Sequence, residues 1–494
     1  MRIVYSHKII GDYMTRKVLK EKINAVIFEC FNEKYVYDVN KDKILKISDK
    51  SYKELNDNKM SVDFPYNEEI KKIMDKGFLS NHFVEKIYHP STDFVEDILN
   101  NNIQKLCLQI TQNCNFRCKY CVYSGEYETR KHENKAMSWE TAKEAIDFLI
   151  EHSSSATSLN IGFYGGEPLM NFELIKKCME YAESHIDGKT IGYSMTTNGS
   201  LLTDEIIEEL LKRQFKLTIS IDGPKDIQDA NRVMVNGKGS FDVVYKNIVR
   251  LCKKYPNLKE NLSYSMVFDP KHGFEKIENF VLTEDELFHD APIIGSIINE
   301  NFKKENEEKA IWKEEFTEEW EYSKMKYMLF LIGKFSDRYN SKIMRDVFLE
   351  LIKRMKKTRE NYRKLGKQDH PTGQCVPGEI RLFVNADGIF YPCERVSETS
   401  KIMQIGNLQS GFDFDKVRKL LNIGKITEEE CKNCYAFRHC NVCIAYSDPG
   451  NSDSELSRKH KLEACRNAKN GFKMDLKNIV ALKKCGFELE KYHY

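Results

Sequence analysis

The chain has 494 residues, of which 77 are Lys or Arg and 75 are Asp or Glu, so its net charge at pH 7 is +2. This length allows roughly two to four domains, and the near balance of charge disfavours non-specific binding to nucleic acid or to a membrane surface. The N-terminus lacks the apolar core of a signal peptide, and no apolar run reaches about 18 residues. We therefore expect a cytoplasmic protein that binds neither nucleic acid nor membrane.

Residues 1–90 are predicted to form a small separate unit. Three short β-prone runs, NAVIFECF, KYVYDV and ILKI, precede helix-like stretches. Gly77 lies where the second of these helices would end, in a C-cap position.

Between residues 100 and 300, β-prone runs alternate with helical stretches. The six strand candidates are LCLQI, LNIGFY, IGYSMTT, KLTISIDG, LSYSMVF and APIIGSII. Ser138, Thr203 and Ser240 each lie where an N-cap would begin the following helix. Consecutive β-α units predict an α/β fold with a parallel sheet and outer helices. We expect this sheet to close into a partial (β/α)6 TIM-like barrel, with sites at the strand ends.

Three further segments complete the chain. Residues 301–370 are dense in charge, with aromatic and aliphatic residues interspersed, and are predicted to be a helical bridge with a solvated face and no chemistry. Residues 371–470 are rich in cysteine, and residues 471–494 are predicted to be a C-terminal helix.

The cysteines need an explanation, because the chain has 15 of them. Disulfide scaffolds belong to small secreted domains. In a reducing compartment we expect clustered cysteines to hold metal and isolated ones to pack as small hydrophobic residues. Clusters occur within 114–121 and 375–465, and the isolated residues are Cys30, Cys107, Cys178, Cys252 and Cys485.

The first cluster has the spacing C-x3-C-x2-C, formed by Cys114, Cys118 and Cys121 directly after a strand candidate. Thiolates suit zinc or iron–sulfur clusters. Structural zinc closes its shell with four protein ligands, and a bacterial ferredoxin run has a different spacing. Three cysteines around a [4Fe–4S] cluster would leave one iron free to bind a small molecule.

This motif, with Tyr120 before the third cysteine, resembles that of the radical S-adenosylmethionine (SAM) superfamily. The resemblance implies that the open iron chelates the amino and carboxylate groups of SAM, and that reduction yields a 5′-deoxyadenosyl radical. GGEPL, TTNG and SIDG end the next three strands, where the family contacts SAM, although GGEP or TTNG alone could be a turn. The contacts implied are Tyr120, Gly165, Gly166, Glu167, Pro168, Thr196, Thr197, Asn198, Ser220, Asp222 and Arg232.

The second cysteine group contains CKNC and CNVC, which taken alone are also compatible with a zinc ribbon. Behind a radical SAM core the group resembles the SPASM extension, which holds two auxiliary [4Fe–4S] clusters, so that three clusters are expected in all. The resemblance assigns one auxiliary cluster to Cys431, Cys434, Cys440 and Cys465. It assigns the other to Cys375, Cys393 and Cys443, although only two residues separate Cys440 from Cys443 where the usual pattern has three.

The auxiliary cluster of Cys375, Cys393 and Cys443 has one iron without an assigned ligand. Another side chain or a remaining cysteine fills this position, or the open iron binds a substrate thiol. Coordination would keep that thiol deprotonated and would hold its sulfur beside a carbon radical of the substrate.

Two classes of SPASM enzyme and one other class of protein fit these motifs. Anaerobic sulfatase-maturating enzymes make formylglycine from Cys or Ser, and they carry Asp after the second SPASM cysteine as a base. This chain has Glu394 there, which can also accept a proton. The second class modifies ribosomally made peptides by joining a cysteine sulfur to a carbon. The other class is a binding or regulatory protein that uses metal only for structure.

We favour the peptide-modifying class for two reasons. Residues 1–90 resemble the small winged-helix-like, PqqD-like leader-recognition domain (RRE) of such maturases, whose strand edge captures a leader peptide; the alternative is a plain capping domain. The runs LQITQNCNFRCKYCVYSGEY and IGFYGGEPLMNFELIK resemble maturases of cysteine-rich peptides. We therefore predict a thioether-forming maturase of sactipeptide or ranthipeptide type. It would act on a leader-bound, Cys-rich precursor with a flavodoxin- or ferredoxin-type electron donor.

Overall fold

The computed structural model describes residues 22–487, apart from 214, 289–290, 299, 301, 305, 308–309, 337–338, 361 and 451–454. The first 21 residues of the predicted N-terminal unit and the last seven of the predicted C-terminal helix therefore lie outside the described residues.

The N-terminal unit is a three-stranded antiparallel sheet with two helices on one face. Its elements are β1 (Ala25–Cys30), β2 (Glu33–Asp38), β3 (Lys43–Ile47), α2 (Asp49–Asp57) and α3 (Glu68–Asp75). Because side chains alternate along a strand, Ile27 and Val36 pack against α2 and α3, whereas Tyr35 and Tyr37 face the main core. Helix α3 ends as predicted, with Gly77 at a φ of +77° directly after the cap residue.

This unit contacts the cysteine-rich segment through the turn between β2 and β3. Arg438 donates from Nε to the carbonyl of Val39 over 2.6 Å. His439 Nε2 lies 2.8 Å from Oδ1 of Asp42, and both side chains are buried. The N-terminal unit is therefore fixed to the loop that carries Cys440.

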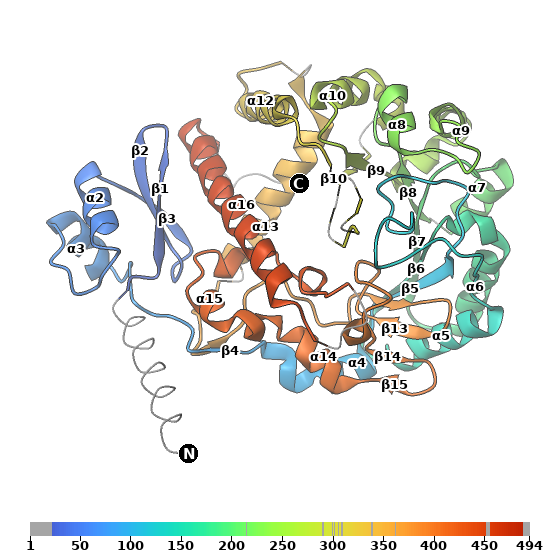
Figure 1. Ribbon diagram of the computed structural model, residues 1–494, viewed down its shortest axis with the longest axis horizontal. Helices are drawn as coiled ribbons and strands as arrows, with labels where there is room; N and C mark the ends of the chain where they lie inside the picture. The colour runs from blue at the N-terminus through green and yellow to red at the C-terminus, as the bar shows by residue number, and fades with distance from the viewer. Residues whose placement is uncertain are drawn as a thin grey trace.

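A large, mostly parallel sheet lies on the side of the molecule away from the N-terminal unit, on the right in Figure 1. Its strands stand in the order β10-β9-β8-β7-β6-β5-β12-β13-β14-β15. The parallel run consists of β5 (Lys105–Thr111), β6 (Ser158–Gly165), β7 (Thr190–Thr197), β8 (Lys216–Ser220), β9 (Leu262–Phe268) and β10 (Ile293–Ile297). These strands coincide with the six candidates, so the predicted parallel sheet is confirmed; closure into a partial barrel stays a prediction.

Helices connect the parallel strands. They are α5 (Trp139–Glu151), α6 (Phe172–His185), α7 (Asp204–Leu211), α8 (Lys225–Asn231), α9 (Phe241–Lys254), α10 (Phe274–Thr283) and α11 (Asp285–Phe288). Ser138 and Thr203 cap α5 and α7 with their hydroxyl groups, as predicted. Ser240 precedes α9 as predicted, but its hydroxyl accepts from Gln228 instead of capping the helix.

The cysteine-rich segment extends the same sheet. Strand β12 (Leu382–Val384) pairs in parallel with β5, and β13 (Ile389–Tyr391), β14 (Gly406–Asn407) and β15 (Gly411–Phe412) follow in antiparallel order. Strand β13 ends two residues before Cys393. The sheet therefore carries the first cysteine loop and Cys393 on neighbouring parts of one framework.

The remaining elements link these parts. They are β4 (Lys86–Ile87), α4 (Val95–Asn101), α12 (Glu314–Leu331), α13 (Lys342–Glu360), β11 (Gln368–Asp369), α14 (Phe414–Leu421), α15 (Glu428–Lys432) and α16 (Arg458–Lys484). Helices α12 and α13 pack against α10 and β10, and their role as a bridge to the C-terminal part stays a prediction. Helix α16 begins at Arg458, earlier than predicted, and runs beside the N-terminal sheet (Figure 1). Among the described helices, none is long and apolar enough to cross a membrane.

Candidate functional site

The three cysteines of the first motif lie on the loop that follows β5. Cys114 and Cys118 are buried, and Cys121 is half-buried. The loop is anchored by Phe116, whose ring is buried and whose backbone bridges that of Met234. The loop therefore brings the three thiols to the carboxyl end of β5, as the spacing predicts.

These thiols lie within electrostatic reach of one another. Burial raises the pKa of Cys114 and of Cys118 to about 12, and the neighbouring thiolates add to this rise. A coordinating metal removes such protons, because a metal-bound thiol is deprotonated outright. The three soft donors fit an iron–sulfur cluster that has three protein ligands.

Glu167, from the GGEP motif at the end of β6, joins two strand ends. Its carboxylate is almost fully buried and accepts from the Thr197 hydroxyl at 2.7 Å and from the Asn198 backbone at 2.7 Å. The Asn198 side chain donates to Asn115 at 2.8 Å and lies 3.9 Å from Sγ of Cys114. Glu167 thus links the ends of β6 and β7 beside the cysteine loop, and its predicted contact with SAM stays a prediction.

Gly165 and Gly166 permit a close approach of backbone to backbone. A Cβ atom on Gly165 would lie 2.0 Å from the carbonyl oxygen of Thr111, and one on Gly166 would lie 2.1 Å from that of Asn113. The amide of Glu167 also donates to Asn113 over 2.9 Å. These glycines are therefore required by the close contact with the cysteine loop, and their predicted contact with SAM stays a prediction.

Asp222, Arg232 and Tyr120 form a second buried group beside the loop. Arg232 Nε lies 3.0 Å from Asp222 Oδ2, and the Tyr120 hydroxyl donates to the same oxygen. The Arg232 guanidinium lies 5.4 Å from the centre of the Tyr120 ring. Asp222 also accepts from the backbone of Val267 at 2.9 Å. Both Asp222 oxygens therefore have donors, whereas the buried Nε of Arg232 pairs with Asp222 by charge and makes no hydrogen bond within the described residues.

The other predicted SAM contacts lie around these two groups. Pro168 is buried and begins a short 3-10 turn after the glycines. Thr196 is exposed at the end of β7, and Ser220 is buried at the end of β8. Most of the predicted SAM-contact residues thus lie at the carboxyl ends of β6, β7 and β8. Arg232 lies in the segment that follows β8, and Tyr120 lies on the cysteine loop after β5.

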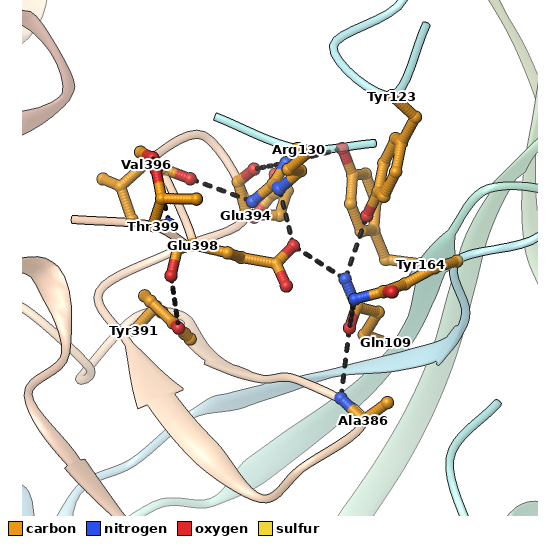
Figure 2. Close-up of polar contacts among 12 residues, drawn as sticks. Gln109, Tyr123, Arg130, Tyr164, Ala386, Tyr391, Glu394, Val396, Glu398 and Thr399 are labelled. Carbon is orange, nitrogen blue, oxygen red and sulfur yellow. Dashed lines mark hydrogen bonds and ion pairs between the residues drawn. The ribbon is translucent and has the colours of Figure 1, made fainter. Parts of the chain in front are cut away.

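Arg130 ties the loop after Cys121 to the segment after Cys393 (Figure 2). It donates to the carbonyls of Glu394 at 2.8 Å and Val396 at 2.9 Å, and its Nε lies 2.6 Å from Glu398. Its side chain is buried. The position of Cys393 relative to the first cysteine loop therefore depends on one buried cation.

Gln109 on β5 completes this network. Its Nε2 donates to Glu398 at 2.7 Å and to the Tyr123 hydroxyl at 3.0 Å, as Figure 2 shows. Its Oε1 accepts from the Ala386 backbone at 3.1 Å. Sequence reasoning missed Gln109 and Arg130, because neither belongs to a motif and their partners lie far along the chain.

Glu394 has one carboxylate oxygen in use and one available. Oε1 pairs with Arg381, whereas Oε2 is buried and has no hydrogen-bond partner among the described residues. The negative charge of Glu394 raises the pKa of Cys393 and that of Tyr164. The Cys121 thiolate also raises the pKa of Tyr164. The predicted base Glu394 therefore lies within electrostatic reach of Cys393, and its second oxygen could accept a proton.

Four C-terminal cysteines line one cavity of about 550 Å³: Cys431, Cys434, Cys440 and Cys465. They come from α15, from the turn that follows it, and from α16. This is the set that the SPASM resemblance assigns to one auxiliary cluster, and the number of thiols matches the ligation of a [4Fe–4S] cluster.

Cys375, Cys393 and Cys443 form the third group. Each lies within electrostatic reach of another member, and burial raises the pKa of Cys393 to about 12. Among the described residues, no group of three His, Cys, Asp or Glu side chains lies close enough together to hold a single metal ion. Of the five isolated cysteines, Cys107, Cys178 and Cys252 are buried as expected, whereas Cys485 is exposed.

Residues 108–283 match the family model described as the radical SAM superfamily. The radical SAM cyclopropyl synthase TigE of Paramaledivibacter caminithermalis is 29% identical over 211 residues, which cover 40% of this chain and 42% of TigE. The serine-type anaerobic sulfatase-maturating enzyme of Bacteroides thetaiotaomicron is 31% identical over 188 residues, which cover 38% of this chain and 45% of that enzyme. The matched part of the chain thus spans less than half the length of either relative.

A solved structure described as native anSMEcpe with bound AdoMet is also similar. It has a TM-score of 0.53 at 21% sequence identity, and the match covers 76% of this chain and 99% of that one. At this identity the likeness establishes a shared fold.

Proposed function

Because residues 108–283 form a radical SAM domain, we propose that this protein joins cysteine sulfur atoms to carbon atoms in a ribosomally made, cysteine-rich peptide. A radical SAM domain implies a [4Fe–4S] cluster, and Cys114, Cys118 and Cys121 are the residues that would hold it. When bound there, SAM supplies a 5′-deoxyadenosyl radical that takes a hydrogen atom from the peptide. Each thioether then costs the peptide two hydrogens, one as an atom from carbon and one as a proton from sulfur.

The observation that carries this proposal is the buried contact of Arg130 with the segment after Cys393. This contact supports the idea that the first cysteine loop and the group of Cys375, Cys393 and Cys443 act on the same bound peptide. That group has three thiols for a four-iron cluster, so it is suited to hold the peptide's own thiolate in the fourth position. Holding sulfur and carbon together in this way lowers the entropic part of the barrier.

Glu394 is the residue that we assign to proton transfer. Its Oε2 is buried and lacks a hydrogen-bond partner in the described part of the chain, and Arg381 holds the other oxygen. Arg381 occupies Oε1, so Oε2 is the oxygen that is placed to accept a proton. In the thioether reaction the proton comes from the substrate cysteine.

The second candidate is an anaerobic sulfatase-maturating enzyme that makes formylglycine from Cys or Ser. It is favoured by the relative from Bacteroides thetaiotaomicron, whose name states that activity. Glu394 would then take the place of the Asp that the family carries. The two candidates need the same radical domain and differ only in the fate of the substrate carbon.

The N-terminal unit is proposed to bind the leader of the precursor peptide. Its sheet has the order β1-β2-β3, and α16 contacts β1. Strand β3 is therefore the edge at which an added strand would pair, with backbone hydrogen bonds giving affinity. Electrons would come from a flavodoxin- or ferredoxin-type donor.

Mass spectrometry of a cysteine-rich precursor after anaerobic turnover tests the proposal. Loss of two hydrogens for each crosslink is expected, with fragmentation blocked across each ring. An aldehyde at Cys or Ser would instead establish sulfatase maturation. Protein that holds only zinc and does not cleave SAM under reducing conditions would contradict both enzyme functions and favour a structural role for the metal.

A further inference from the structure

Lys461 is a buried lysine on α16, four residues before Cys465. Only 2% of this residue is exposed. A lysine is almost never fully buried unless its charge is paired, because an ammonium group that leaves water without a partner loses a large hydration energy. The position of Lys461 therefore requires a partner that compensates its charge.

The partners of Lys461 are a hydroxyl and a thiol. Its Nζ donates to Thr427 Oγ1 and lies 3.6 Å from Sγ of Cys431. The Thr427 hydroxyl itself lies 3.3 Å from the same sulfur. None of the ion pairs found among the described residues includes Lys461. The sulfur of Cys431 is thus the thiol that Lys461 contacts directly, and the Lys461 charge also acts on Cys465.

We infer that Lys461 raises the reduction potential of an iron–sulfur cluster held by Cys431, Cys434, Cys440 and Cys465. This inference rests on the proposed function only in requiring that these four thiols hold a cluster. A thiolate ligand supplies the negative charge that the buried ammonium needs. Reduction adds one more negative charge to the cluster, so a nearby cation and a hydrogen bond to sulfur stabilise the reduced form.

In the first cysteine loop, the hydrogen-bond neighbours of Cys114 Sγ are neutral: the backbone amide of Phe116 at 3.3 Å and the amide of Asn198 at 3.9 Å. Neutral donors shift charge less than an ammonium group does. The charges of Arg232 and Arg117 also act on the thiols of this loop, so cations influence both clusters. The C-terminal group differs in that an ammonium group directly contacts a ligand sulfur, and a potential raised in this way would suit that cluster to take the electron left over when a thioether forms.

Lys461→Met removes the charge and keeps the length and apolar stem of the side chain. Redox titration of the anaerobically loaded enzyme, followed by electron paramagnetic resonance, measures the potential of each cluster. In Lys461→Met, we expect the equilibrium constant for reduction of the C-terminal cluster to fall about tenfold. For a one-electron couple this corresponds to a reduction potential about 59 mV lower. The signal of the first cluster is expected to keep its potential.

Lys459→Met is the matched control, because Lys459 lines the same cavity from an exposed position. Its charge is screened by water and salt, so we expect a much smaller shift. Thr427→Val provides a second variant of nearly equal volume. It removes a neutral hydrogen bond to the same sulfur and should lower the potential by less than Lys461→Met does.

The outcomes separate this inference from the proposed function. If the reduction potentials are unchanged in both Lys461→Met and Thr427→Val, the inferred role of Lys461 is wrong. The proposed enzymatic function would not be affected by that result. If Cys465→Ala retains the full iron content and all cluster signals, the four thiols do not hold a cluster, and the cofactor assignment fails. Equal shifts in Lys461→Met and Lys459→Met would also overturn the inference, since the effect would then be a general surface charge.

Discussion

The first cysteine loop and the C-terminal cysteine cavity differ in what surrounds their sulfur atoms. The first loop has three thiols beside two buried polar groups, one centred on Glu167 and the other on Asp222. The cavity has four thiols and a buried lysine beside Cys431. Around a four-iron cluster, the first arrangement would leave a ligand position with polar groups beside it, whereas the second would close its ligand set and place an ammonium group directly against a ligand sulfur. The same ligand type is thus suited to bind a small molecule at one place and to store an electron at the other.

The largest effect is expected from Cys118→Ala, which removes one of three ligands from the first loop. The cluster there should be lost with about four irons, and SAM cleavage should stop. Cys465→Ala makes the same chemical change in the cavity. It should also lose about four irons, yet it should still cleave SAM in the absence of peptide. Iron analysis and chromatography of 5′-deoxyadenosine measure these results, and equal loss of cleavage in both variants would contradict the division of roles.

Glu394→Gln is expected to slow product formation by about 100-fold or more, which is the usual contribution of a general base. The amide keeps the size of the side chain but cannot take a proton. SAM cleavage without peptide should continue, because the change lies outside the first loop. The ratio of modified peptide to 5′-deoxyadenosine should therefore fall. An unchanged ratio would rule out Glu394 as the proton acceptor.

Asp222→Asn tests the buried polar group beside the first loop. Removing one partner of a buried ion pair leaves Arg232 uncompensated, which typically costs about 3–5 kcal/mol in the free energy of unfolding. Asp242→Asn is the control, because the Asp242–Lys225 pair is exposed and such pairs contribute about 0–1 kcal/mol. Thermal denaturation of the two variants compares them. A similar change in both would show that the Asp222 pair does not stabilise the loop.

Two glycine substitutions are expected to change stability in opposite directions, and the change at Gly471 is the smallest of these effects. Gly166→Ala places a Cβ atom 2.1 Å from a backbone oxygen, so the loop must shift, and both stability and SAM affinity should fall. Gly471→Ala lies within α16, where a Cβ atom meets nothing within 4 Å. Helix propensity should there raise the free energy of unfolding by up to about 1 kcal/mol. Loss of stability in Gly471→Ala would mean that the space beside α16 is filled.

The parallel sheet and the first site could be predicted from the sequence because their signals are local. Six apolar strands alternate with amphipathic helices, and GGEP and TTNG directly follow strands. The roles within the site were harder to predict. The hydrogen bonds of Glu167 with Thr197 and Asn198, which lie at another strand end, became clear only from the fold, and its contact with SAM stays a prediction.

The joining of the C-terminal segment to the sheet could not be predicted. Strands β12 to β15 have two or three residues each, too few to show a period of two. Arg130 and Lys461 carried no signal either, since a single cation in a charged chain is usually solvated. Both side chains are important because they are buried beside partners that are distant in the sequence. The partner of Arg130 lies more than 250 residues along the chain, and that of Lys461 lies 30 residues along it.

The central claim is that one iron at the Cys114–Cys121 loop has no protein ligand and is bound by SAM. Electron–nuclear double resonance of the reduced, anaerobically prepared enzyme, with isotopic labels in the amino and carboxylate groups of SAM, measures this contact directly. If SAM binds this iron, coupling between the labels and the first cluster is expected in the wild type and in Cys465→Ala. A fully loaded wild-type enzyme that shows no such coupling at saturating SAM would contradict it.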